Sequence, residues 1–426
     1  MPPRKILYVH PSNELYGGDR MLLWILKLLP RDTYAPHVVV PNDLPYEGLL
    51  TRELHAIDVP YQELKLGVLR RRYQSVPGMA LFTWRTLASA WQMARFCRAN
   101  QVALVHSNST AVVAGALAAR LAGIPHVWHV REIITTPERL HRGMAQLLWR
   151  LSSRVLTVSS PVREHLLAAQ PELAYKTRVV YDGLDPSPFI RVDPDAVAQQ
   201  RRAWGLGPKD SADGGLLIGM VGRISSWKGQ ELLVRAAAPV LVNHPQAHLA
   251  LVGGNVPGEE WREEALRDLI RELGIAERVH LEGFRTDVPV VMGSFDVFCL
   301  PSTRPDPFPG VVLEAMAAGL PVVATAHGGP LEQVVEGETG YLVSPDGPEQ
   351  MSQALERLAQ DGALRRTLGT AGRMRMLARF STARYVEEVV AVYETLLAES
   401  ARRRSRRIWP WHARKADSAT HRVRKT

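Results

Sequence analysis

Short apolar runs rich in valine, isoleucine and leucine alternate along the chain with longer stretches whose apolar residues recur at helical spacing. Such runs, where they end at glycine or polar residues, predict buried parallel strands, and the longer stretches predict the helices that cover them. The expected strands are residues 6–9, 38–40, 103–106, 126–130 and 155–158 in the first half, and 216–221, 249–252, 279–281, 297–300 and 322–324 in the second. The pattern therefore predicts two α/β domains with a cleft between them.

Helix breakers place the domain boundaries. Residues 184–214 are rich in proline, glycine and aspartate and predict a linker region with a short helix over 195–204. We expect an N-terminal domain over 1–183 and a C-terminal domain over 215–385. An apolar stripe at helical spacing predicts a C-terminal helix over 386–400. The main helices within the domains are expected at 21–29, 83–99, 111–121, 231–242, 261–273 and 311–318.

The net charge of +9 is concentrated at the C-terminal end. Residues 401–426 contain ten Lys and Arg and one Asp, so the first 400 residues are neutral overall. We interpret this tail, expected to be disordered, as a contact for anionic lipid, which attracts each nearby basic charge by about 1 kcal/mol. The alternatives are a solubilising end and a nucleic-acid contact. No nucleic-acid motif accompanies the tail, so no nucleic-acid partner is expected.

A second basic segment, residues 70–98, interleaves arginines with Phe82, Trp84 and Trp91. A helix of this composition suits a membrane surface or a lipid-linked acceptor, and the alternative is an ordinary helix packed on a sheet. No run approaches the roughly 20 apolar residues of a membrane span. The two cysteines, Cys97 and Cys299, follow no metal or redox spacing. We therefore expect a cytoplasmic protein, peripheral at the inner face of the plasma membrane.

The most informative segment, residues 301–343, reads PSTRPDPFPGVVLEAMAAGLPVVATAHGGPLEQVVEGETGYLV. It predicts a proline-rich loop after a strand, then a helix that begins near Gly310. The backbone amides at this helix start, those of Gly310, Val311 and Val312, suit a phosphate group. Seven residues lie between Asp306 in the loop and Glu314 in the helix. The two carboxylates supply acceptors for sugar and ribose hydroxyls.

This segment resembles the donor-site signature of the family 4 retaining glycosyltransferases, which have the GT-B fold. The resemblance implies two Rossmann-like domains facing a central cleft, with the nucleotide sugar held by the C-terminal one. Glu314 matches the family's glutamate that holds the ribose. Asp306 stands where the family usually has a glutamate that contacts the sugar, and Pro309 precedes Gly310 where the family usually has Phe-Gly directly.

A second motif, residues 221–229 (VGRISSWKG), places Gly222, Arg223 and Lys228 on one loop after a strand. Two cations there can neutralise the charge that develops on a departing diphosphate. The resemblance assigns this role to Arg223 and Lys228. Arg285, in a Gly-Phe-Arg segment, also falls in the family's order. We expect no metal and no cofactor, with the nucleoside diphosphate sugar as co-substrate.

The N-terminal half carries a weaker match. Gly17 and Gly18 resemble the family's glycine loop near the reacting sugar, and a tight turn without a ligand is the alternative. The family's histidine beside the donor sugar corresponds either to His129 or to Arg131. Strand alternation puts both side chains on one face, so the sequence leaves both open. We place His129 among the catalytic candidates and Arg131 among the substrate-binding ones.

Taken together, the motifs predict a retaining glycosyltransferase that moves a sugar from a nucleoside diphosphate to an acceptor hydroxyl. The expected acceptor is a lipid-linked or cell-surface glycan, as in polysaccharide, lipopolysaccharide or capsule biosynthesis. Two alternatives remain open at this point. One is another GT-B enzyme, such as a nucleotide-sugar epimerase or a phosphorylase, and the other is a non-catalytic scaffold that binds a nucleotide sugar.

Overall fold

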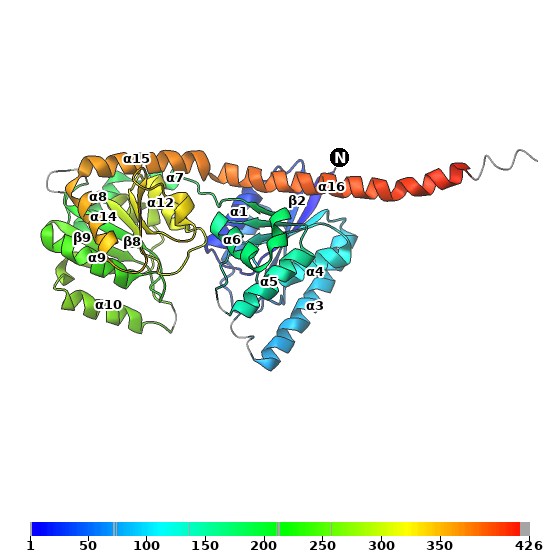
Figure 1. The fold of residues 1–426 in the computed structure, drawn as a ribbon, viewed down its shortest axis with the longest axis horizontal. Helices are drawn as coiled ribbons and strands as arrows, with labels where there is room; N and C mark the ends of the chain where they lie inside the picture. Colours follow the sequence, from blue (N-terminus) through cyan, green and yellow to red (C-terminus); the bar gives the residue numbers. More distant parts are fainter. Residues whose placement is uncertain are drawn as a thin grey trace, which may run out of the picture. The chain divides into compact units, whose positions relative to one another are not determined.

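The first half of the chain (blue to green in Figure 1) forms a parallel sheet, and its seven strands have the order β3-β2-β1-β4-β5-β6-β7. Residues of the central strands β4 and β5 are buried throughout, because helices cover both faces of the sheet. The strands are β1 (Arg4–Val9), β2 (Tyr34–Pro41), β3 (Tyr61–Leu64), β4 (Leu104–Ser107), β5 (His126–Val130), β6 (Arg154–Thr157) and β7 (Thr177–Val179). The computed structural model describes residues 2–417 except 71, 72, 74, 136, 210, 212, 213 and 257, with side chains up to residue 402.

Two apolar clusters bind the helices to this sheet. On one face Tyr8 of β1 packs with Leu26 of α1 and Tyr393 of α16. On the other face Val105 of β4 packs with Met93 of α3 and Ala118 of α4. The helices are α1 (Gly17–Leu28), α2 (Leu49–Ala56), α3 (Val76–Ala99), α4 (Val113–Ala122), α5 (Glu138–Leu151), α6 (Ser160–Ala169), the 3-10 turn η2 (Pro171–Tyr175) and α16 (Thr382–Asp417).

The second half forms a parallel sheet of six strands in the order β10-β9-β8-β11-β12-β13. Its strands are β8 (Leu216–Val221), β9 (Ala247–Val252), β10 (Val279–Glu282), β11 (Val297–Leu300), β12 (Val322–Thr325) and β13 (Gly340–Val343). Its helices are α7 (Ser187–Ile190), α8 (Pro194–Ala203), α9 (Gln230–Asn243), α10 (Trp261–Glu272), the 3-10 turn η3 (Ala276–Arg278), α11 (Val288–Ser294), α12 (Gly310–Ala318), α13 (Pro330–Gln333), α14 (Glu349–Gln360) and α15 (Gly362–Arg379).

The chain divides into two compact units, which differ from the expected domains at their edges. The first unit contains Met1–Thr157, Arg163–Val180 and Tyr385–Thr426, and the second contains Val158–Val162 and Tyr181–Arg384. Residues 184–214, expected as a linker, are therefore part of the second unit. Arg201 of α8 explains this, because its fully buried guanidinium donates to Asp296 Oδ2 at 2.9 Å and to Ser294 O at 2.7 Å.

The C-terminal helix also differs from the expected range of 386–400. The helix α16 begins at Thr382 and runs to Asp417, so its backbone continues well into the basic segment that we expected to be disordered. Residues 418–426, the side chains of 403–417, and Arg71 and Arg72 lie outside the described residues, so the structure does not address the tail's side chains. No helix within the described part of the chain is long and apolar enough to cross a membrane.

Candidate functional site

The strand order of the second sheet places two predicted motifs side by side. β8 and β11 are neighbours, and from this pair the sequence order of the strands runs outward in opposite directions. Ligands of open parallel sheets bind at the carboxyl ends of the strands at such a switch point. The loop 222–229 follows β8 and the loop 301–309 follows β11, so both predicted donor-site loops lie at this edge.

Glycine brings these two loops into contact. Gly229, just before α9, has a φ of +80°, and a Cβ there would lie 1.8 Å from the carbonyl oxygen of Pro301. Only glycine fits both the left-handed backbone and the close approach. The Thr303 amide donates to the Trp227 carbonyl at 2.8 Å and fastens the loops together. These contacts place the side chain of Lys228 at the end of β11.

Lys228 Nζ lies 2.6 Å from Asp306 Oδ2, and both side chains are largely buried. The backbone of Asp306 is held in place, because its carbonyl oxygen accepts from the Gly329 amide at 2.7 Å. Gly328, with a φ of +66°, permits this approach, since a Cβ there would lie 2.3 Å from the Asp306 carbonyl oxygen. The structure thus joins two predicted site residues in one ion pair.

The helix α12 begins beside this pair. Gly310 is exposed, and a Cβ on it would meet nothing within 4 Å, so the first turn is open to solvent. The N-cap residue, Pro309, gives the first turn no side-chain hydrogen bond. The N–H groups at this end, together with the helix dipole, suit an anion. Glu314 lies half-buried one turn further along the same helix.

The two remaining cations among the predicted site residues differ in their surroundings. Arg223 is the second residue after β8 and is exposed at the switch point. Arg285 follows the edge strand β10, and Asp287 accepts from its Nε at 2.7 Å and its Nη2 at 2.6 Å. This bidentate pairing raises the pKa of the Arg285 guanidinium. Arg285 therefore carries its own carboxylate partner, and its predicted contact with substrate stays a prediction.

The first unit has a polar network at the corresponding switch point, between β1 and β4. His10, which follows β1, places Nε2 2.7 Å from Asp19 Oδ1, and Asn108 after β4 donates to His10 Nδ1 at 3.0 Å. All three side chains are buried. Asp19 also accepts from the Tyr16 amide at 2.8 Å and so fixes the start of α1. The sequence interpretation missed His10, although a polar residue at a strand end is a usable signal.

The structure around this network differs from the expected glycine loop, and the network itself extends to Arg131. Gly17 and Gly18 are the first two residues of α1 rather than a loop before it. Asn108 also donates to the Gly18 carbonyl at 3.1 Å and accepts from Arg131 Nε at 3.2 Å. Arg131 Nη2 donates to the Tyr385 hydroxyl at 2.8 Å. Arg131 is thus held beside the start of α1, at the carboxyl edge of the sheet.

His129, the other candidate, lies inside β5 and is fully buried. Its ring stacks on His106, with ring centroids 5.5 Å apart, and neither ring nitrogen has a hydrogen-bond partner among the residues that the structure describes. Burial holds the pKa of His129 well below its usual range, so the ring is neutral. Of the two candidates, Arg131 is the one at the open edge. The catalytic role predicted for His129 stays a prediction.

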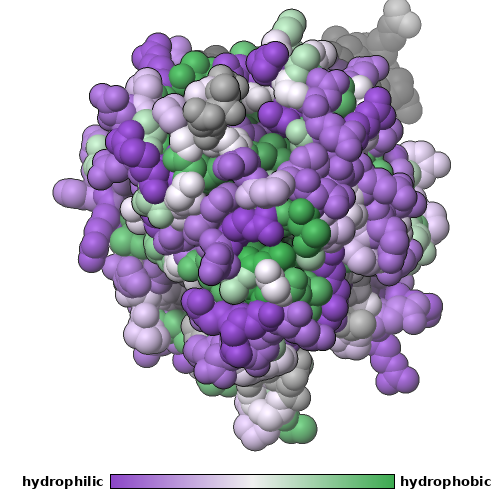
Figure 2. All heavy atoms as spheres, turned by 90° about the vertical axis from the view of Figure 1, so that its left-hand side faces the viewer, coloured by the Kyte–Doolittle hydropathy of each residue, from purple (hydrophilic) through white to green (hydrophobic). Residues whose placement is uncertain are grey.

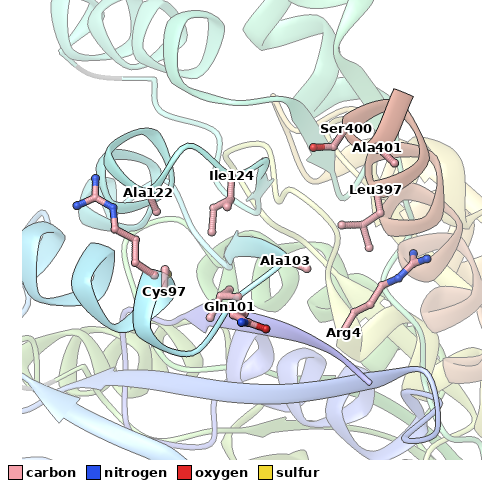
Figure 3. A pocket seen from close by; sticks show the side chains of 11 residues that line it. Arg4, Cys97, Gln101, Ala103, Ala122, Ile124, Leu397, Ser400 and Ala401 are labelled. Carbon is pink, nitrogen blue, oxygen red and sulfur yellow. The ribbon is translucent and has the colours of Figure 1, made fainter. Parts of the chain in front are cut away.

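The linings of two hollows do not include Lys228, Asp306, Arg131 or His129. A cavity of about 550 Å³ opens at the opposite, amino-terminal edge of the first sheet, with Leu397 and Ser400 of α16 on one side and Cys97 and Ala122 on the other (Figure 3). Seen from the side of α9 and α10, the surface is largely hydrophilic with a small hydrophobic area near its centre (Figure 2). A groove between these helices reaches Ser225 and Ser226 of the β8 loop.

Among the described residues, no group of three or more His, Cys, Asp or Glu could hold a metal ion.

Comparison with known proteins identifies what this arrangement is similar to. A family model described as glycosyl transferases group 1 matches residues 208–375, and one described as glycosyltransferase family 4 matches residues 17–188. A D-inositol 3-phosphate glycosyltransferase of Stackebrandtia nassauensis is 32% identical over 65% of this chain and 64% of its own length. The spore coat protein SA of Bacillus subtilis is 27% identical over 57% of this chain and 65% of its own. The chain therefore spans somewhat less than two thirds of the length of these two relatives.

Solved structures align over more of the chain. The structure of Anabaena HepE in complex with UDP and glucose has a TM-score of 0.76 and 25% identity, and the alignment covers 92% of this chain and 100% of that one. The sucrose-phosphate synthase of Thermosynechococcus elongatus has a TM-score of 0.71 over 93% of this chain, with 23% identity.

Proposed function

Since the chain belongs to the group 1 glycosyltransferases of family 4 and has their two-domain GT-B fold, we propose that it transfers a sugar from a nucleoside diphosphate to an acceptor hydroxyl with retained anomeric configuration. The observation that carries the proposal is the Lys228–Asp306 ion pair at the switch point of the second sheet. It sets a cation and a carboxylate side by side next to an open helix N-terminus.

In the proposed reaction, the bond between the sugar's anomeric carbon and the diphosphate oxygen breaks while the acceptor oxygen attacks the same face. The acceptor proton passes to the departing diphosphate oxygen. Negative charge grows on the diphosphate, and Lys228, Arg223 and the first turn of α12 stabilise it. Glu314 accepts from the ribose hydroxyls and Asp306 from a sugar hydroxyl. Asp306 must exchange its bond to Lys228 for these contacts when the donor binds.

The proposed donor is a nucleoside diphosphate sugar used without a metal ion. HepE, the similar protein, has been crystallised with UDP, with UDP-glucose, and with UDP and glucose. In our proposal the two cations and the helix dipole supply the charge that a divalent metal supplies in other transferases. Activity in the presence of a chelator would support this part of the proposal.

We propose a lipid-linked or cell-surface glycan as the acceptor, in polysaccharide, lipopolysaccharide or capsule assembly, and a peripheral position at the inner face of the plasma membrane. The support is the composition of α3 and the basic tail. The helix α3 carries three arginines, no acidic residue, and several exposed apolar side chains.

The test is a transfer assay of the full chain with UDP-, GDP- and ADP-sugars, an acceptor panel, and EDTA. We expect one donor to release its nucleoside diphosphate in an acceptor-dependent way, and NMR of the product to show the donor's anomeric configuration. Inverted product would contradict retention. Donor binding without hydrolysis, and without transfer to any acceptor, would show that the protein is a nucleotide-sugar-binding scaffold and not an enzyme.

A further inference from the structure

The helix α3 leaves one long face without a protein partner among the described residues. Its buried positions include Ala90, Met93 and Cys97, which pack in the core beneath the sheet. Its first half continues beyond these, and in Figure 1 that half (light blue) extends away from the sheet. Large apolar side chains stay exposed along it: Val76, Met79, Leu81, Trp84, Leu87 and Trp91. Large apolar side chains exposed in this number on one helix mark an interaction surface.

The exposed residues form a stripe with a defined chemistry. Trp84, Leu87 and Trp91 recur at three- and four-residue spacing, and Arg95 and Arg98 continue the same stripe toward the end of the helix. Trp84 is 70% exposed and Trp91 56%. The guanidinium carbon of Arg95 lies 4.7 Å from the ring centroid of Trp91. Tryptophan beside arginine is the combination that settles at the boundary between lipid head groups and acyl chains.

The charge of the surroundings decides between occupants. The helix α3 has three arginines and no acidic residue over its 24 positions. The helix α4, which packs against α3, adds Arg120 and no acidic residue. A second copy of this chain would bring a like-charged surface to meet this one, and such contacts repel. An anionic surface is instead attracted by every one of these cations.

We propose that the exposed stripe of α3 binds an anionic lipid bilayer, with Trp84, Leu87 and Trp91 inserted at the level of the head groups and Arg95 and Arg98 paired with lipid phosphates. This surface deepens the proposed function, because it brings the first unit to the place where a lipid-linked acceptor lies. The membrane contact stands on α3 alone and does not depend on the sugar chemistry. It can therefore hold even where the donor assignment fails.

The chain offers a matched control on α10. Trp261 is 57% exposed, and the Arg262 guanidinium carbon lies 4.3 Å from its ring centroid, so Trp261 is like Trp91 in its exposure and in having an arginine over its ring. The helix α10 differs in charge, since it carries Glu263, Glu264, Asp268 and Glu272. We therefore expect no binding of anionic lipid to α10.

The experiment measures sedimentation of the full chain with vesicles of phosphatidylglycerol and phosphatidylcholine in equal parts, and with phosphatidylcholine alone. We expect binding to the anionic vesicles only, weakened at least 10-fold in Trp84→Ala/Trp91→Ala and at high salt, and unchanged in Trp261→Ala. The double variant should keep wild-type circular dichroism and wild-type nucleotide binding, which separates a lipid defect from misfolding or from failure of the donor site.

Two results would overturn the proposal. Equal anionic-lipid binding by the wild type and the double variant would assign the membrane contact to the basic tail. A wild-type chain that dimerises at micromolar concentration in sedimentation velocity, and whose double variant is monomeric, would show that a second copy covers the stripe.

Discussion

Lys228 Nζ and Asp306 Oδ2 lie 2.6 Å apart, although 78 residues separate them in the sequence. The pair joins the loop after β8 to the loop after β11, at the point where the strand order of the second sheet reverses. In the absence of a donor, each charge satisfies the other. A donor diphosphate and its sugar offer each partner a replacement, so the pair holds the two side chains ready at the positions where substrate arrives.

The first prediction concerns the cation of this pair. Lys228→Met removes the charge that faces the departing diphosphate, and we expect transfer turnover to fall by about 100-fold or more. Lys228→Arg keeps the charge but changes its shape, so it should retain more activity. Nucleotide release under saturating donor checks this. A fall in Lys228→Met of less than fivefold would show that the cation does not act on the leaving group.

The second prediction concerns the glycine that brings the loops together. Gly229→Ala adds strain of about 1–2 kcal/mol at its positive φ and also forces a Cβ into the Pro301 carbonyl. We expect both thermal stability and transfer activity to fall. Gly274→Ala is the control, because Gly274 has a φ of +69° and open space around its Cβ position. It should gain a similar strain energy but keep its activity. Equal activity in both variants would contradict the role given to Gly229.

The third prediction concerns the anchor of the segment 184–214. Arg201→Ala leaves Asp296 with the Leu217 amide as a donor but without its cation, and removes the donor that Arg201 gives to several backbone carbonyls. Loss of one member of a buried ion pair costs about 3–5 kcal/mol. The neighbouring Arg202→Ala is exposed and should change stability by less than about 0.5 kcal/mol. Denaturant unfolding measures both. Equal midpoints for the two variants would show that Arg201 does not anchor this segment.

The fourth prediction follows from buried histidines in the first unit. Burial lowers the pKa of His126 to about 3, from a usual value of 6.5. Below pH 6.5 the unfolded chain takes up a proton that the folded chain does not, so acid destabilises the fold by about 1.4 kcal/mol per pH unit for each such group. His106 and His129, also fully buried, act in the same direction. Tm should fall steadily from pH 7 to pH 5. A less steep fall in His126→Gln would confirm the assignment, and a Tm independent of pH over this range would refute it.

The sequence was sufficient where elements are buried on both faces. The strands β5, β8 and β11 have the bounds that their apolar runs predict. The strands β3, β7 and β13 were not predicted, and all three lie at an end of their sheet. An edge strand has a solvent-facing side and needs no continuous apolar run. β3, with its alternately exposed residues, shows this directly.

The candidate site also has a part that local sequence patterns predict and a part that they do not. The motifs predicted Lys228 and Asp306 separately, because each stands in a loop with a recognisable pattern. Their contact depends on the close approach of Gly229 to Pro301, which no local pattern encodes. The network of His10, Asp19 and Asn108 was missed for a related reason, since its members come from three separate segments and meet only once β1 and β4 pair.

The central claim is that the carboxyl edge of the second sheet binds a nucleoside diphosphate. Calorimetric titration of the full chain with UDP, GDP and ADP in the presence of EDTA tests it most directly, with Glu314→Ala and Lys228→Met as site variants. Glu231→Ala, which changes an exposed glutamate of α9, serves as the control. We predict that one nucleotide binds, that both site variants bind it at least 10-fold more weakly, and that the control is unchanged. No binding of any nucleotide, or equal binding by all four proteins, would contradict the account.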